Sequence, residues 1–167
     1  MSMIGNFLAL PDEELQALFA DPSRVEQLLY ESLLGGGSNG KGDELEIDKS
    51  WHGLHFLLTG SAWEGSFPLN FIVAGGQDVG DDLGYGPARG LTSTEVLQVD
   101  AALAPLTPDE LGQRFDAQRM TELQIYPDGW SHDPDGEREY LLDFYADLRA
   151  FVRRTAEQRH ALLVYLS

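Results

Sequence analysis

Both ends of the chain carry a short, mostly apolar run, residues 3–10 and residues 161–166. Pro11 closes the first run, and the second contains only Ala, Leu, Val and Tyr. Apolar runs of this length predict strands that are buried on both faces, and such a strand without a partner would promote aggregation. We therefore expect the two ends of the chain to pair with each other in one small sheet.

The sequence between these runs predicts mostly helices. Most of the predicted helix starts carry a Ser, Thr or Asp cap, a proline at the first position or an acidic first turn. The predicted starts are Asp12, Asp21-Pro22, Ser50, Thr92, Thr107 and about Glu137. The last of these helices is long and amphipathic and runs to about Glu157. A chain of 167 residues fits one domain, so we predict a helix-rich α+β single domain over residues 1–167.

Two glycine-rich segments interrupt the helices. Residues 35–42 resemble a phosphate-binding loop, but Gly42 stands where magnesium coordination needs a Ser or Thr hydroxyl, and the segment follows a helix instead of a strand. We predict a simple loop there and a second, acidic loop over residues 75–90. The apolar residues 67–74 fit a helix or a strand equally well.

The charge of the chain limits its partners. The net charge is −17, from 28 acidic and 11 basic residues, which argues against nucleic acid and against anionic membranes. A basic protein partner fits this balance, although a high charge also serves solubility. There is no cysteine, and the N-terminus lacks the pattern of a signal peptide, so we expect a cytoplasmic protein.

His52 and His55 lie three residues apart on the predicted helix after Ser50. Together with Asp48 they would make an incomplete zinc or iron site. The interpretation that we favour is structural: His55 is buried and hydrogen-bonded, and His52 lies at the surface. Asp133–Gly136 is no calcium loop, because Leu142 stands where a bidentate Glu is required. We expect neither a metal nor another cofactor.

Tyr85 and Arg89 give the segment 75–90 its chemical interest. A tyrosine ring and a planar guanidinium on a glycine-rich backbone suit a small anionic ligand. The interpretation that we favour is that Arg89 is exposed and pairs with Asp81 or Asp82, which would only fix the loop.

Three segments resemble the YfbM-like family, a bacterial domain of unknown function. They are MIGNFLAL at the N-terminus, the motif KSWHGLHFLLTG from Lys49 to Gly60, and GYGPARGLT. The resemblance implies a compact α+β domain and brings no established reaction, cofactor or catalytic residue. It implies only where a ligand would be sought first, at Trp51, His55, Tyr85 and Arg89.

Two functional hypotheses follow. The first is a non-enzymatic, acidic protein-binding module of inhibitor or immunity type, because no catalytic constellation accompanies the high negative charge. The alternative is an enzyme or a small-ligand-binding protein with one cleft that joins Trp51 and His55 to Tyr85 and Arg89.

Overall fold

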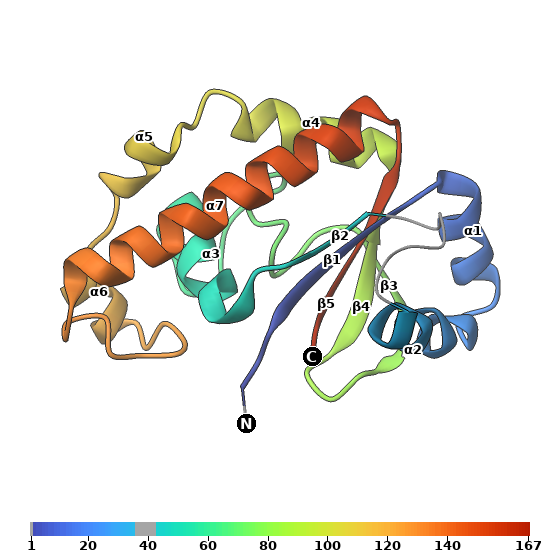
Figure 1. Ribbon diagram of the computed structural model, residues 1–167, viewed down its shortest axis with the longest axis horizontal. Coiled ribbons are helices and arrows are strands. Elements are labelled where there is room, and N and C mark those ends of the chain that lie inside the picture. The colour runs from blue at the N-terminus through green and yellow to red at the C-terminus, as the bar shows by residue number, and fades with distance from the viewer. Residues whose placement is uncertain (1, 36–42) are drawn as a thin grey trace.

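A five-stranded antiparallel sheet forms the centre of the molecule, with the strand order β2-β1-β5-β4-β3. The computed structural model describes residues 2–35 and 43–167 (Figure 1). The strands are β1 (Gly5–Leu10), β2 (Glu44–Glu46), β3 (Gln77–Asp82), β4 (Pro87–Leu91) and β5 (Ala161–Leu166). The helices are α1 (Asp12–Ala20), α2 (Arg24–Gly35), the 3-10 turn η1 (Asp48–Ser50), α3 (Trp51–Thr59), α4 (Ser93–Leu103), α5 (Pro108–Gly112), α6 (Ala117–Glu122) and α7 (Pro134–Glu157).

The two ends of the chain pair in the middle of this sheet, as predicted. β1 and β5 are aligned along their whole length, from Gly5 opposite Leu166 to Leu10 opposite Ala161. Both strands are apolar apart from Asn6 at the start of β1, because helices cover both faces of the sheet. The α+β fold is therefore confirmed, together with the role of the terminal strands.

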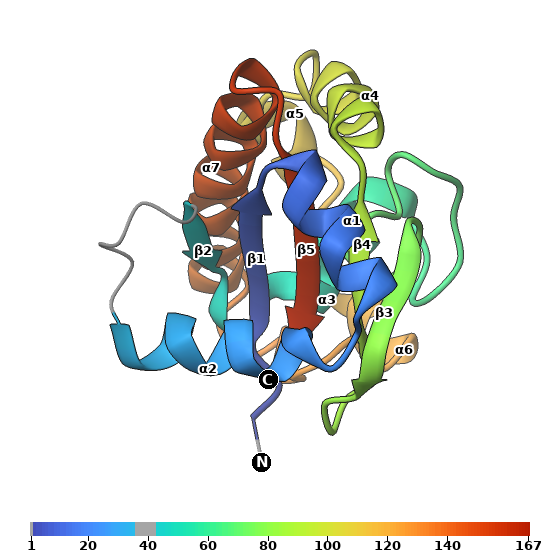
Figure 2. The same cartoon turned by 90° about the vertical axis from the view of Figure 1, so that its right-hand side faces the viewer.

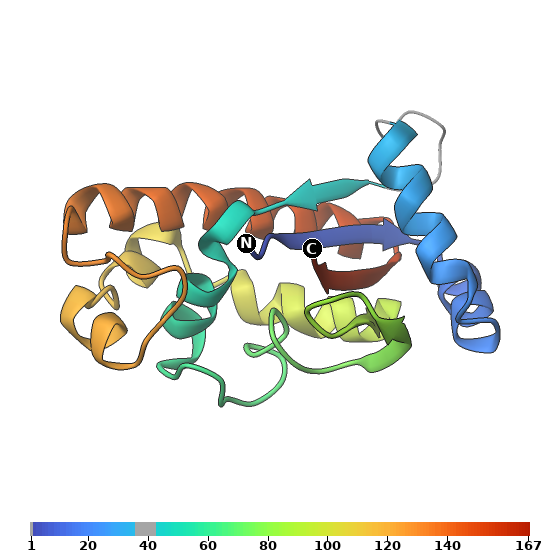
Figure 3. The same cartoon turned by 90° about the horizontal axis from the view of Figure 1, so that it is seen from below.

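The sheet separates two apolar cores. Side chains alternate along a strand, so Phe7 packs on the face that carries α3, α4 and α7, whereas Leu8 packs on the face that carries α1 and α2. Figure 2 shows α1 and α2 on the near side of the sheet and α4 and α7 on the far side. The view from below in Figure 3 places α1 and α2, in blue, at the right-hand end of the molecule and the start of α7, in orange, at the left-hand end. The outer surfaces of α1 and α2 and the outer surface of α7 thus lie on opposite sides of the sheet.

The prediction of an acidic loop over residues 75–90 is wrong, because much of this segment forms the β-hairpin β3–β4. β4 pairs with β5, with Arg89 opposite Val164 and Leu91 opposite Leu162. Glycine weakens a strand, but α1 packs so closely on β4 that a larger residue would not fit at Gly90. A Cβ at that position would come within 2.6 Å of the Leu15 side chain. Tertiary packing thus overrides the local preference for a loop.

Helix boundaries follow the predicted caps in part. Thr92 forms a complete capping box with Glu95, and Gly60 ends α3 in the left-handed conformation with φ 75°. Ser50 does not cap α3: the turn η1 precedes that helix, and the Ser50 hydroxyl donates back to the carbonyl oxygen of Ile47 at 2.6 Å. The turns over residues 67–74 are neither the strand nor the regular helix that their apolar pattern allows.

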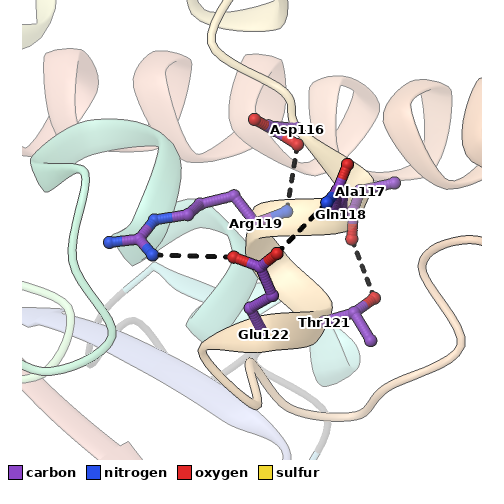
Figure 4. Close-up of polar contacts among 6 residues, drawn as sticks. All are labelled: Asp116, Ala117, Gln118, Arg119, Thr121 and Glu122. Carbon is purple, nitrogen blue, oxygen red and sulfur yellow. Dashed lines mark hydrogen bonds and ion pairs between the residues drawn. The ribbon is translucent and has the colours of Figure 1, made fainter.

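α6 has no counterpart among the predicted helices. Asp116 caps it by accepting from the backbone N–H of Arg119 at 3.0 Å, and Arg119 pairs with Glu122 at 3.7 Å (Figure 4). The glycine loop predicted over residues 35–42 lies outside the described residues, apart from Gly35, where α2 ends. In the described ranges, no helix has both the length and the apolar character needed to cross a membrane.

Candidate functional site

α3 is the most deeply buried helix of the fold. Every residue from Trp51 to Leu58 is buried, including both histidines. A helix that is buried on all sides packs in an interior, and α3 contacts η1, α5 and α7. The expectation that His52 lies at the surface is wrong, because its side chain is only 1% exposed.

His52 is fully hydrogen-bonded inside this core. The backbone N–H of Tyr126 donates to its Nδ1 at 2.8 Å, so the ring proton lies on Nε2, which donates to the carbonyl oxygen of Ala62 at 2.7 Å. The ring also stacks on Trp51 and lies 4.2 Å from the ring of Trp63. Burial lowers the pKa of His52, although its bond to Ala62 opposes this effect. Neither ring nitrogen is available as a metal ligand.

His55 is buried and hydrogen-bonded, as predicted. Its Nε2 lies 3.0 Å from the carbonyl oxygen of Glu64 and 3.3 Å from the hydroxyl of Thr59. Burial lowers the pKa of His55 to about 4, against the opposing bond to Glu64, so the ring is neutral at pH 7. Its Nδ1 is buried with no hydrogen-bond partner among the described residues. No group of three or more His, Asp or Glu side chains in these residues is placed to hold a metal ion.

Trp51 joins this helix to the N-terminal segment. Its indole N–H donates to the carbonyl oxygen of Met3 at 3.0 Å, and its ring stacks on Tyr126 at 5.7 Å. Trp63 covers the outer side of this cluster and is 62% exposed. Tyr126 and Trp63 were not among the residues predicted for a site, although Trp63 is one of the three tryptophans in the chain.

The prediction of an exposed Arg89 is wrong. Its guanidinium donates to the carbonyl oxygens of Gly75, Phe71 and Ile72 at 2.8, 3.0 and 2.7 Å. Burial lowers the pKa of Arg89 to about 10, and the nearby carboxylate of Asp78 opposes this shift. Arg89 thus fastens the segment before β3 to the hairpin through backbone groups.

The acidic residues of the hairpin also have other partners than predicted. Asp82 accepts from the backbone N–H groups of Gly84 and Gly86 at 2.7 and 3.0 Å, and these bonds lower the pKa of its carboxyl group. Tyr85 lies half-buried in the turn between these glycines. Trp51 and His55 therefore belong to the interior of α3, whereas Tyr85 and Arg89 belong to the hairpin. Ligand binding at these four residues stays a prediction.

Replacing Arg89 tests its role as a fastener. We expect Arg89→Ala to lower the free energy of unfolding by about 2 kcal/mol, because three half-buried carbonyl oxygens lose their donor. Arg119→Ala is the matched control and should cost less than about 0.5 kcal/mol, since it removes an exposed ion pair. Urea denaturation measures both variants, and equal small losses would contradict the fastening role.

A groove between α1 and α2 is the clearest surface feature on the near side of the sheet. Its volume is about 160 Å³. Its lining combines a short apolar floor with charged side chains and consists of Glu14, Ala17, Leu18, Arg24, Gln27, Leu28 and Glu31. Gln27 donates to the Glu31 carboxylate at 3.2 Å. No sequence pattern predicts this groove, because it arises where two helices meet.

Comparisons with known proteins agree with this architecture. A model of the family described as "Domain of unknown function (DUF1877)" matches residues 1–165. "Protein YfbM" from Escherichia coli (strain K12) is 30% identical over 172 residues, which cover 98% of each chain. The crystal structure of YfbM from Escherichia coli, a protein of unknown function, has a TM-score of 0.73 at 26% identity and covers 98% of this chain and 99% of that chain. The resemblance seen in the three sequence segments is confirmed: the chain belongs to the DUF1877 family.

Proposed function

We propose that this protein is a non-enzymatic binding module of inhibitor or immunity type that engages a basic segment of a partner protein in the cytoplasm. The groove between α1 and α2 is the observation that supports this function most directly. A lysine or arginine side chain has an apolar stem and a cationic head, and both parts need a matching surface.

The groove offers both parts. Ala17, Leu18 and Leu28 supply the apolar surface for a stem, and the carboxylates of Glu14 and Glu31 supply acceptors for a cationic head. In the described lining, one cation, Arg24, stands against the two glutamates, so the groove carries an excess of negative charge.

The surroundings of the groove extend this negative charge. The first turn of α1 is acidic, and Asp21 and Glu26 are exposed near the start of α2. β3 lies beside both helices and exposes Asp81. Such a field mainly accelerates association and selects partners of opposite charge. A basic segment several residues long therefore fits this face better than an isolated cation.

Charge reversal in the groove tests the proposal. A fluorescein-labelled, arginine- and lysine-rich peptide should bind the protein in an anisotropy titration, and a glutamate-rich peptide of equal length should not. We expect the double variant Glu14→Lys/Glu31→Lys to weaken binding by about tenfold or more, since it removes both acceptors and repels the ligand.

The matched control changes the net charge by the same amount on the other side of the sheet. Glu139→Lys/Asp143→Lys alters two exposed carboxylates on α7 and should leave the affinity within about twofold. Equal losses in the two double variants would mean that only overall charge attracts the peptide, and the groove would then have no specific role. Failure of the basic peptide to bind at low salt would also overturn the proposal.

A further inference from the structure

A second groove lies on the opposite side of the sheet, between the end of α4, the start of α5 and the last third of α7. Figure 1 shows α7 crossing this side of the molecule beside α4. The volume of the groove is about 440 Å³. It is lined by Asp100, Ala104, Pro108, Ala146, Arg149, Ala150, Arg153 and Arg154.

This groove concentrates arginine in an acidic protein, although carboxylates beside it pair with two of its guanidinium groups, Glu157 with Arg153 and Asp43 with Arg154. Among the described residues, its lining holds three arginines and one carboxylate, in a protein with 11 basic residues and a net charge of −17. The remaining lining residues are three alanines and a proline, which leave the walls between the guanidinium groups small and apolar. Guanidinium N–H donors at the rim and small apolar walls between them suit an amphipathic anion.

The three guanidinium groups are held in place by bonds that do not use all their donors. Nε and Nη2 of Arg149 donate to the carbonyl oxygens of Leu103 and Ala104 at the end of α4. Nε and Nη2 of Arg154 donate to the carboxylate of Asp43 at 3.2 and 3.1 Å.

Arg153 is held more loosely than its neighbours, since only its Nε donates to Glu157, at 3.4 Å. In the part of the chain that the structure describes, Nη1 of Arg149, Arg153 and Arg154 has no protein acceptor. A guanidinium has five N–H donors, so each arginine keeps some for a ligand. Prior fixation of these side chains reduces the entropy that binding would cost.

We propose that the groove between α4 and α7 binds a small organic anion, whose phosphate or carboxylate head meets Arg149, Arg153 and Arg154 and whose apolar body lies against the alanines. Guanidinium groups recognise both kinds of head through paired N–H donors. The groove lies within the range of about 300–1,000 Å³ that is usual for small-molecule sites. This site does not depend on the proposed partner site between α1 and α2, which lies across the sheet.

Isothermal titration calorimetry with naphthalene compounds tests both parts of the ligand. We expect 1-naphthyl phosphate or 1-naphthoate to bind, and we expect neutral 1-naphthol and inorganic phosphate to bind at least tenfold more weakly. If 1-naphthyl phosphate binds more tightly, the natural ligand carries a phosphate group. If 1-naphthoate binds more tightly, the natural ligand carries a carboxylate. Equal affinity for naphthol would overturn the proposal, because the arginines would then contribute nothing.

Variants locate the binding in the groove. Arg153→Ala/Arg154→Ala should weaken binding of the better anion at least tenfold, and Ala150→Glu should do the same by placing a carboxylate on the apolar wall. Arg119→Ala removes a similarly exposed, ion-paired arginine on α6 and should leave binding unchanged (Figure 4). Arg149 stays intact in these variants, because it also bonds to the end of α4.

Circular dichroism confirms that each variant is folded before titration. Ala150→Glu replaces one exposed helix-forming residue by another, so it keeps the test valid if the arginine double variant unfolds. An equal loss in Arg119→Ala, or no loss in Ala150→Glu, would place any binding elsewhere and overturn the site. Failure of both anions to bind at millimolar concentration would overturn it as well.

Discussion

His52→Ala is expected to lower the free energy of unfolding by about 3 kcal/mol, one of the largest effects of any single polar residue in this fold. The substitution leaves the N–H of Tyr126 and the carbonyl oxygen of Ala62 without their partner. It also removes a ring that packs between two tryptophans. Urea denaturation at pH 7.5 measures the loss.

Two partial replacements separate the hydrogen bonds from the packing. His52→Asn keeps an acceptor near the position of Nδ1, and His52→Gln keeps a donor near that of Nε2, so each should recover part of the lost stability. His132→Ala is the control, because that histidine is exposed, and it should change stability by less than about 0.5 kcal/mol. A loss below about 1 kcal/mol for His52→Ala would show that the two backbone groups find other partners.

Acid is expected to destabilise the protein well above the usual pKa range of carboxyl groups. Burial lowers the pKa of His55 from 6.5 to about 4, so the unfolded chain takes up a proton that the folded chain does not. The stability contributed by neutral His55 is therefore complete above pH 6.5 and is lost as the pH falls towards 4. We expect a loss of about 1–2 kcal/mol from this residue between pH 7.5 and pH 5, after allowance for solvent screening. His52, whose pKa is also lowered, adds a loss in the same direction.

Comparison of variants assigns this pH dependence to the histidine. Urea denaturation at pH 7.5, 6.5, 5.5 and about 5 should give a flatter profile for His55→Gln than for the unchanged protein, since glutamine does not titrate. His132→Gln should keep the original profile, because its side chain is exposed. Parallel profiles for His55→Gln and the unchanged protein would show that carboxyl groups cause the acid sensitivity.

The sequence by itself determined the elements whose cause is local or strongly patterned. Apolar runs at both ends required buried strands, and β1 and β5 are paired over their whole length. Capping residues such as Thr92 and a left-handed glycine such as Gly60 act within one turn of the helix, so they can be read directly from neighbouring residues. The three segments that resemble the YfbM-like family were sufficient to identify the family.

Only the tertiary structure decided features that depend on contacts between distant residues. β4 is a strand because β5 offers it hydrogen bonds and α1 offers Gly90 a close contact, although its own sequence favours a loop. His52 is buried because Ala62 and Tyr126, 10 and 74 residues away, satisfy both ring nitrogens. The two grooves also escape sequence analysis, because each arises where separate helices meet and no sequence pattern records the distance between them. Charge could be counted from the sequence, but the placement of an acidic groove and an arginine-rich groove on opposite sides of the sheet is a consequence of the fold.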